Sequence, residues 1–232
     1  MSNWKIVRRN RLLNDLNKTF GVGLEFTDTE AAYISQPAET LERNNVLCKI
    51  FGYRQSIIII DAFACVGGDS ISLMHAFPSC IIHSVQRSET DEEQGRYARL
   101  CRNAVEARKT KPYVTFHSYN CPISTAFSRM PVTAIDLLFL DPPWYLGDTE
   151  LNLGSMVELL RTDVFVPMTH ASLLPEIICM KLCFTASELA DSTDFMQMVA
   201  GYILLLTVPV TRKIKSQETP VYFFHIYGKH PL

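Results

Sequence analysis

The sequence has no long apolar run. No stretch approaches the roughly 18 consecutive apolar residues that a membrane-spanning helix needs. The first residues, MSNWKIVRRN, also lack the apolar segment of a secretory signal peptide. We therefore expect no membrane partner and an intracellular protein, either cytoplasmic or nuclear.

The cysteine pattern of a metal site or a disulfide framework is also missing. The seven cysteines are an odd number, and they include no C-x-x-C pair and no histidine cluster at the spacing of a zinc site. Free cysteine behaves as a small buried apolar group. We expect reduced thiols in the core and no bound metal.

The sequence lacks an excess of positive charge. Its 22 Lys and Arg residues stand against 24 Asp and Glu residues, which gives a formal net charge of −2. A protein that grips many phosphates of a long duplex is usually basic. Any contact with nucleic acid should therefore be short or local.

The N-terminal part differs in pattern from the rest. A basic start with apolar residues at helical spacing indicates an amphipathic helix, and Pro37 is suited to the first position of a second helix. We predict a helical extension over residues 1–50, followed by a larger domain over residues 51–232. The length of the chain suffices for one large core.

From Ser56 onward, short apolar runs alternate with helical stretches, which is typical of a parallel sheet covered on both faces. Helices are expected at 70–76, 91–108 and 185–199, and strands at 57–60, 81–85, 114–117, 135–140, 177–182, 203–208 and 221–227. Too few residues separate the last two strands for a helix, so they should form an antiparallel hairpin. The sequence thus predicts an α/β, Rossmann-like fold with a mostly parallel, seven-stranded sheet, a C-terminal antiparallel hairpin and a short N-terminal extension.

The first strand runs into the loop DAFACVGGDS, which begins at Asp61. In an open α/β sheet, ligands bind beyond the carboxyl ends of the strands. Gly67 and Gly68 permit a tight turn and close approach of the backbone to a ligand, and the N-terminus of the following helix offers amide groups. A plain structural turn remains an equal alternative for this loop.

The fourth strand leads into Asp141-Pro142-Pro143-Trp144. The two prolines restrict the backbone and hold the indole near the edge of the sheet. The amino group of a purine is a poor nucleophile because its lone pair is delocalised into the ring. Hydrogen bonds from the amine to the Asp141 carboxylate and the Pro142 carbonyl would direct that lone pair at a methyl donor, and Trp144 would stack on the base.

Together, DAFACVGGDS and DPPW resemble motifs I and IV of the class I S-adenosylmethionine-dependent methyltransferases, in the subset with a (D/N/S)-P-P-(Y/F/W) tetrad. Within that subset, the glycine loop is most similar to that of the trimethylguanosine synthase family. FGVGLEFTDTEAAYISQPAE and the ending KIKSQETPVYFFHIYG are similar to the same family's extension and final hairpin, so the resemblance covers roughly residues 20 to 228.

The resemblance implies S-adenosylmethionine as cofactor and a set of residues that hold it. Asp61, Phe63, Gly67 and Gly68 would line its methionine part. Two further positions, which normally carry acidic residues that hold the ribose hydroxyls and the adenine amine, are filled by Gln86, with Glu89 nearby, and by Asn120. Neutral amides accept hydrogen bonds less strongly than carboxylates, which predicts reduced cofactor affinity.

For the substrate, the resemblance implies a capped RNA 5′ end. Trp144 would stack on the cap guanine, Asp141 and Pro142 would face its N2 amine, and Tyr145 is a candidate for a second aromatic contact. The family usually has Ser where this chain has Asp141, and Asp is typical of adenine-N6 enzymes. Adenine in RNA or DNA therefore stays open as the acceptor.

Two further alternatives stay open. The replacements at Gln86 and Asn120 are compatible with an inactive, methyltransferase-like scaffold, and a partner protein could complete the substrate groove. The leading hypothesis requires the glycine loop and the Pro142-Pro143 corner to open onto a common cleft.

Overall fold

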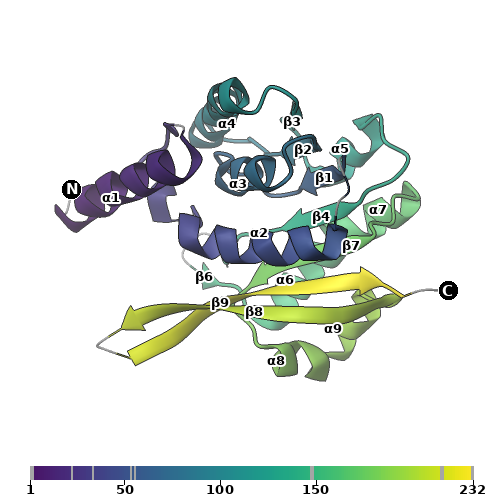
Figure 1. Ribbon diagram of the computed structural model, residues 1–232. Helices are drawn as coiled ribbons and strands as arrows, with labels where there is room; N and C mark the ends of the chain where they lie inside the picture. The colour runs from purple at the N-terminus through teal and green to yellow at the C-terminus, as the bar shows by residue number, and fades with distance from the viewer. Residues whose placement is uncertain are drawn as a thin grey trace. The chain divides into compact units, whose positions relative to one another are not determined.

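The computed structural model describes residues 3–21, 23–32, 34–52, 54, 56–146, 149–214 and 217–230 (Figure 1). The chain divides into two compact units, residues 1–121 and residues 122–232. The predicted division into residues 1–50 and 51–232 stays a prediction. By contacts, the N-terminal helices belong to the same compact unit as the glycine loop.

The first unit contains three parallel strands, with β2 in the middle. Figure 1 shows helices α2 and α3 side by side in this unit. Its elements are α1 (Asn3–Phe20), the short 3-10 helix η1 (Glu30–Ala32), α2 (Pro37–Phe51), β1 (Ile58–Asp61), α3 (Gly68–Ala76), β2 (Ile81–Val85), α4 (Asp91–Thr110) and β3 (Thr115–Tyr119).

Local sequence explains where the helices of this unit begin. Pro37 occupies the first turn of α2, where a missing N–H group costs nothing. The Thr90 side chain accepts a hydrogen bond from the Glu93 amide, and the Glu93 carboxylate accepts one from the Thr90 amide, so that a capping box starts α4. Both starts agree with the predicted helices.

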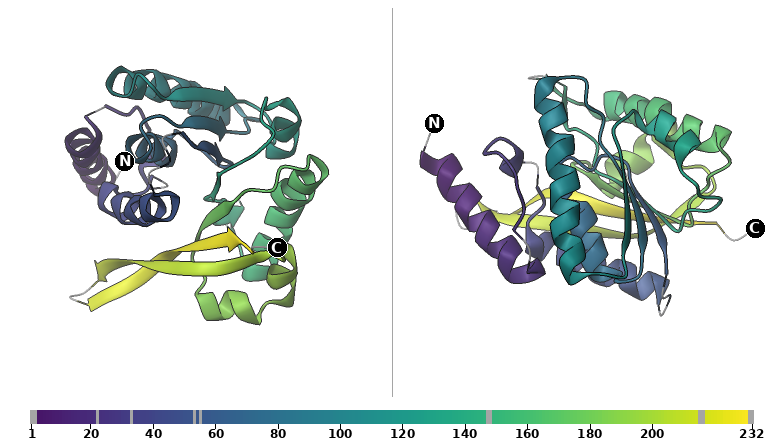
Figure 2. Two further views of the ribbon diagram at one scale, coloured as in Figure 1. Left: turned by 45° about the vertical axis from the view of Figure 1, so that its right-hand side comes forward. Right: turned by 90° about the horizontal axis from the view of Figure 1, so that it is seen from above.

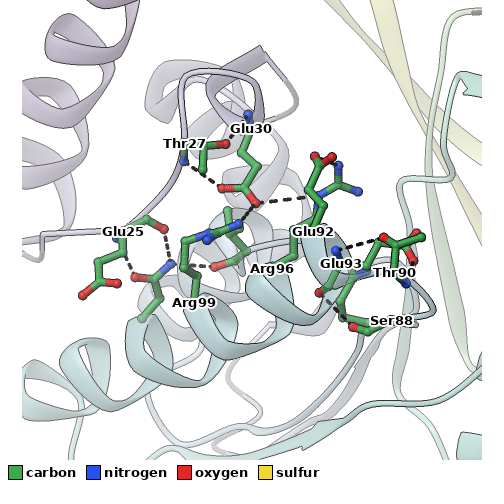
Figure 3. A network of polar contacts seen from close by, with 12 residues as sticks. Glu25, Thr27, Glu30, Ser88, Thr90, Glu92, Glu93, Arg96 and Arg99 are labelled. Atoms are coloured by element: carbon green, nitrogen blue, oxygen red, sulfur yellow. Dashed lines mark hydrogen bonds and ion pairs between the residues drawn. The ribbon is translucent and has the colours of Figure 1, made fainter. Parts of the chain in front are cut away.

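The segment between α1 and α2 is fastened to α4 by buried polar groups (Figure 3). The Glu30 carboxylate, whose side chain is 1% exposed, forms ion pairs with Arg96 and Arg99. The same carboxylate accepts a hydrogen bond from the Thr27 amide at 2.7 Å. A carboxylate is stable in such a position only when charges and donors compensate it. The segment that contains Thr27 and Glu30 is therefore held to α4 by compensated, buried charges.

The second unit contains two parallel strands, β4 and β7, followed by the antiparallel strands β9 and β8. Figure 2 shows the last two as a long hairpin. The elements are α5 (Ile123–Arg129), β4 (Leu137–Leu140), β5 (Tyr145–Leu146), β6 (Thr149–Glu150), α6 (Leu153–Leu160), the π-helical turn η2 (Arg161–Phe165), α7 (Val166–His170), β7 (Ile177–Leu182), α8 (Ala186–Asp191), α9 (Thr193–Met198), β8 (Tyr202–Ile214) and β9 (Gln217–Lys229).

The prediction of one continuous helix at residues 185–199 is wrong. The stretch 185–199 forms two helices, α8 and α9, because Ser192 adopts an extended conformation between them. Its hydroxyl caps α9 by accepting a hydrogen bond from the Phe195 amide at 3.3 Å. Serine favours such a cap over a helix interior. Helices α5, α6 and α7 were not predicted from the sequence.

In the described part of the chain, the seven long strands make a mostly parallel sheet that ends in an antiparallel hairpin, and helices accompany it. This α/β architecture is the predicted fold class. The four residues of β4 are fully buried, as expected for a strand covered on both faces. No helix among the described residues is long and apolar enough to cross a membrane.

Candidate functional site

The glycine loop of the first unit is a tight turn between β1 and α3. Gly67 has φ +91°, a left-handed conformation that favours glycine, and it caps α3. A Cβ atom at Gly67 would lie 2.8 Å from Leu100 Cδ1, and one at Gly68 would lie 3.0 Å from Ile34 Cγ2. Contacts with Leu100 and Ile34 therefore explain why both positions need glycine. As at any helix N-terminus, the first backbone N–H groups of α3 make no hydrogen bond within the helix.

Asp61 is completely buried at the end of β1. Its Oδ2 atom accepts a hydrogen bond of 2.5 Å from the Ser70 hydroxyl, which also lies 2.7 Å from the Ser84 hydroxyl. These contacts join the ends of β1 and β2 to the start of α3. Asp61 therefore has a positioning role in the loop, and its predicted contact with the cofactor stays a prediction.

The N-terminal segment supports the loop from a second direction. The side-chain amide of Asn103, on α4, donates to the Val66 carbonyl in the loop and to the Glu25 carbonyl, and its oxygen accepts from the Glu25 amide. Asn103 is 1% exposed, so these partners cannot be replaced by water. The Ser35 hydroxyl donates to Asp69 in the first turn of α3.

The remaining predicted cofactor residues lie at the same edge of this unit, because parallel strands end at a common edge. Gln86 follows β2 and is half-buried, and Asn120 follows β3 and is exposed. Phe63 is half-buried within the loop. The two amides carry donors and acceptors of the kind that ribose hydroxyls and an adenine ring can use, and their contact with a cofactor stays a prediction. Gln86 itself donates to the Arg87 carbonyl at 2.6 Å.

The tetrad of the second unit begins with an ion pair. Asp141 follows β4, and its Oδ2 atom lies 2.6 Å from Lys181 Nζ on β7. The side chains of Asp141 and Lys181 are 17% and 5% exposed. Pro142 is buried and Pro143 is exposed. The sequence therefore predicted the position of the carboxylate but not its counter-charge.

Trp144 is half-buried against the C-terminal hairpin. Its ring meets the Tyr222 ring edge-on, with the centroids 5.4 Å apart. Lys181 Nζ lies 5.4 Å from the centroid of the Trp144 ring and 4.9 Å from that of Tyr222, which are cation–π distances. The backbone of Tyr145 belongs to β5, while its side chain lies outside the described residues.

The predicted site residues are thus gathered into two groups, one in each compact unit. The loop residues, Gln86 and Asn120 lie in the first unit, and the tetrad lies in the second. The predicted common cleft stays a prediction. Within the described part of the chain, no group of three or more His, Cys, Asp or Glu side chains could hold a metal ion.

No protein-family model and no curated protein matches this sequence. Solved structures do match it. A human methyltransferase 10 domain containing protein is similar over 97% of this chain and 97% of its own length, with 11% identity and a TM-score of 0.66. The chain has a methyltransferase fold.

Two further structures agree with this fold. The N-terminal domain of human METTL16 in complex with SAH is similar over 98% of this chain and 83% of that domain, with 9% identity and a TM-score of 0.62. A candidate RNA methyltransferase from Pyrococcus horikoshii is similar over 96% of this chain and 98% of its own length, with 15% identity and a TM-score of 0.53.

Sequence reasoning missed the residues that support the two groups. Lys181 is the only charged residue in the run IICMKL. A charged residue inside a buried strand indicates that a partner of opposite charge lies beside it. Asn103 is a polar residue on the buried face of α4. Neither signal identifies a partner, because both partners are distant in the sequence.

Proposed function

We propose that this chain transfers the methyl group of S-adenosylmethionine to an exocyclic amino nitrogen of a purine in RNA. The observation that carries the proposal is the DPPW tetrad directly after β4 in a chain with a methyltransferase fold. Fold alone does not assign a reaction. The tetrad adds the groups that such a reaction needs, namely a carboxylate, a proline carbonyl and an indole.

The residues have separate roles in this proposal. Asp141 and the Pro142 carbonyl accept hydrogen bonds from the amine, and Trp144 stacks on the base. The start of α3, Gln86 and Asn120 bind the cofactor. When bound, S-adenosylmethionine would supply an electrophilic methyl group to the nitrogen, with its sulfur as the leaving group, and the proton of the methylated nitrogen would pass to water.

RNA is supported as the substrate by two observations. One similar structure is that of a candidate RNA methyltransferase. The formal net charge of −2 suits a small, local nucleic-acid target better than a long duplex. We propose the N2 amine of a cap guanosine as the first acceptor, on the resemblance of the glycine loop and hairpin to trimethylguanosine synthases.

Adenine N6 is the second candidate acceptor, and Asp141 favours it. The tetrad of the cap-specific family begins with Ser, whereas a tetrad that begins with Asp is typical of adenine-N6 enzymes. An RNA carrying a 7-methylguanosine cap and an uncapped RNA containing adenine therefore form the decisive pair of substrates.

The experiment is transfer of labelled methyl from S-adenosylmethionine to these two RNAs, followed by nucleoside analysis. Label in dimethyl- or trimethylguanosine supports the cap acceptor, and label in N6-methyladenosine supports adenine. Isothermal titration calorimetry with S-adenosylmethionine runs beside it. No heat at millimolar cofactor, together with no transfer, would contradict the enzymatic proposal and favour a scaffold.

A further inference from the structure

Lys181 and Asp141 meet because of the strand register. Strands β4 and β7 are parallel, with Leu140 opposite Met180. The next residue on each strand is therefore Asp141 on one side and Lys181 on the other. The ion pair at 2.6 Å follows directly from this register, and it places a cation at the first residue of the tetrad.

The surroundings of Lys181 leave its ammonium group little contact with water. The side chain is 5% exposed, and the rings of Trp144 and Tyr222 lie within cation–π distance of Nζ. Taking a charge out of water is costly, and removing one member of a buried pair leaves the other charge uncompensated. The charges of Asp141 and Lys181 are thus energetically dependent on each other.

The chemistry of Asp141 depends on its charge. An ionised carboxylate only accepts hydrogen bonds, whereas a protonated one also donates. An amine that must direct its lone pair at a methyl group needs acceptors for its two hydrogens. A cation in contact favours the ionised, accepting form of a carboxylate that is as little exposed as Asp141.

We propose that Lys181 is a positioning residue of the acceptor site. Its ammonium group keeps Asp141 ionised and, through the contact with Oδ2, holds the carboxylate beside Trp144. This inference rests on the proposed function. It also predicts that the residues at positions 141 and 181 must match in charge. A neutral Asn at position 141 can accept from the amine without a counter-charge, so it should pair best with an uncharged residue at 181.

The test uses the full chain as wild type, Lys181→Met, Asp141→Asn and the double variant Lys181→Met/Asp141→Asn. Initial rates are measured on the RNA that the wild type methylates, and thermal unfolding checks that each variant is folded. We expect Lys181→Met to lower kcat on the order of 100-fold while the KM for S-adenosylmethionine changes little. The double variant should be at least about tenfold faster than Lys181→Met, because its pair is neutral.

Two controls test whether the loss of activity comes from the lost charge and whether it is specific to position 181. Lys181→Arg keeps the cation and should retain kcat within about tenfold of the wild type. Lys109→Met removes an exposed lysine that pairs with Glu106 on α4, at 2.6 Å, and should leave all rates unchanged. If Lys181→Met does not fold, the comparison of the double variant with Asp141→Asn decides, and a faster double variant supports the pair.

The outcomes are distinct for the two proposals. A wild-type chain that methylates no RNA contradicts the proposed function, and the inference falls with it. A wild type that methylates RNA, with a folded Lys181→Met variant that is equally active, contradicts the inference alone. A double variant that is no faster than Lys181→Met and no faster than Asp141→Asn also contradicts the inference alone.

Discussion

The side-chain amide of Asn103 donates a hydrogen bond of 2.8 Å to the carbonyl of Val66. Val66 lies between Cys65 and Gly67, both of which have positive φ angles. The same amide group binds Glu25, so that the loop, α4 and the N-terminal segment share one buried connection. The shape of the glycine loop therefore depends on a residue 37 positions away.

Asn103→Leu should destabilise the chain by about 3 kcal/mol, because it leaves the buried polar groups of Glu25 and Val66 without partners. The measurement is the free energy of urea unfolding, with S-adenosylmethionine affinity by calorimetry as a second readout that should weaken. Arg102→Ala is the control, since it breaks only an exposed ion pair to Glu25 and should cost less than about 1 kcal/mol. Equal stabilities of the two variants would contradict the role of Asn103.

Gly67→Ala should destabilise the chain by about 2–4 kcal/mol, since alanine is strained at φ +91° and its Cβ atom would meet Leu100. Gly154→Ala is the control, in the first turn of α6. There the nearest atom is Asn152 Oδ1 at 3.5 Å, an ordinary contact, and alanine favours the helix by up to about 1 kcal/mol. Urea unfolding of both variants tests the pair. A Gly67→Ala variant as stable as the wild type would contradict the strained turn.

Stability should fall with acid because of buried histidines. Burial and, to a smaller extent, the neighbouring His117 together lower the pKa of His83 to about 4. His83 is 1% exposed, and Nδ1 lies 2.9 Å from the Tyr119 hydroxyl. The unfolded chain takes up the proton near pH 6.5 and the folded chain does not, so stability present above that pH is lost as pH falls toward 4.

The expected loss from His83 is about 2 kcal/mol between pH 7.5 and pH 5. His83→Phe should flatten the pH dependence of urea unfolding over that range. Burial also lowers the pKa of His75 to about 4, so part of the slope should remain in this variant. A His83→Phe variant with the wild-type slope would exclude His83 as the source.

Trp144→Ala should weaken binding of the base by about 1–3 kcal/mol through loss of stacking, while the cofactor affinity stays the same. The chain has two tryptophans, and a Trp4→Phe background leaves Trp144 as the single indole reporter. Quenching of its fluorescence by the acceptor nucleotide tests contact between the indole and the base, and isothermal titration calorimetry compares the base affinities of the wild type and Trp144→Ala. Unchanged activity of Trp144→Ala on both RNAs would show that the indole does not stack on the substrate.

The strands and their turn residues were accessible from the sequence. Runs such as IIII before Asp61 and LLFL before Asp141 are local signals, since a buried parallel strand needs only a short stretch of consecutive apolar residues. The break at Ser192 was not accessible in the same way, because serine in a polar stretch is compatible with a helix surface and with a cap. The capping hydrogen bond decides between them.

The sequence by itself determined the class of fold, through its alternation of short apolar runs and helical stretches, and also the glycine turn and the tetrad, which each consist of a few adjacent residues. Only the tertiary structure decided which charges and amides accompany them. Lys181 lies 40 residues from Asp141, and Asn103 lies 78 residues from Glu25. Strand register and helix packing bring such pairs together, and those depend on the whole core rather than on any local pattern of residues.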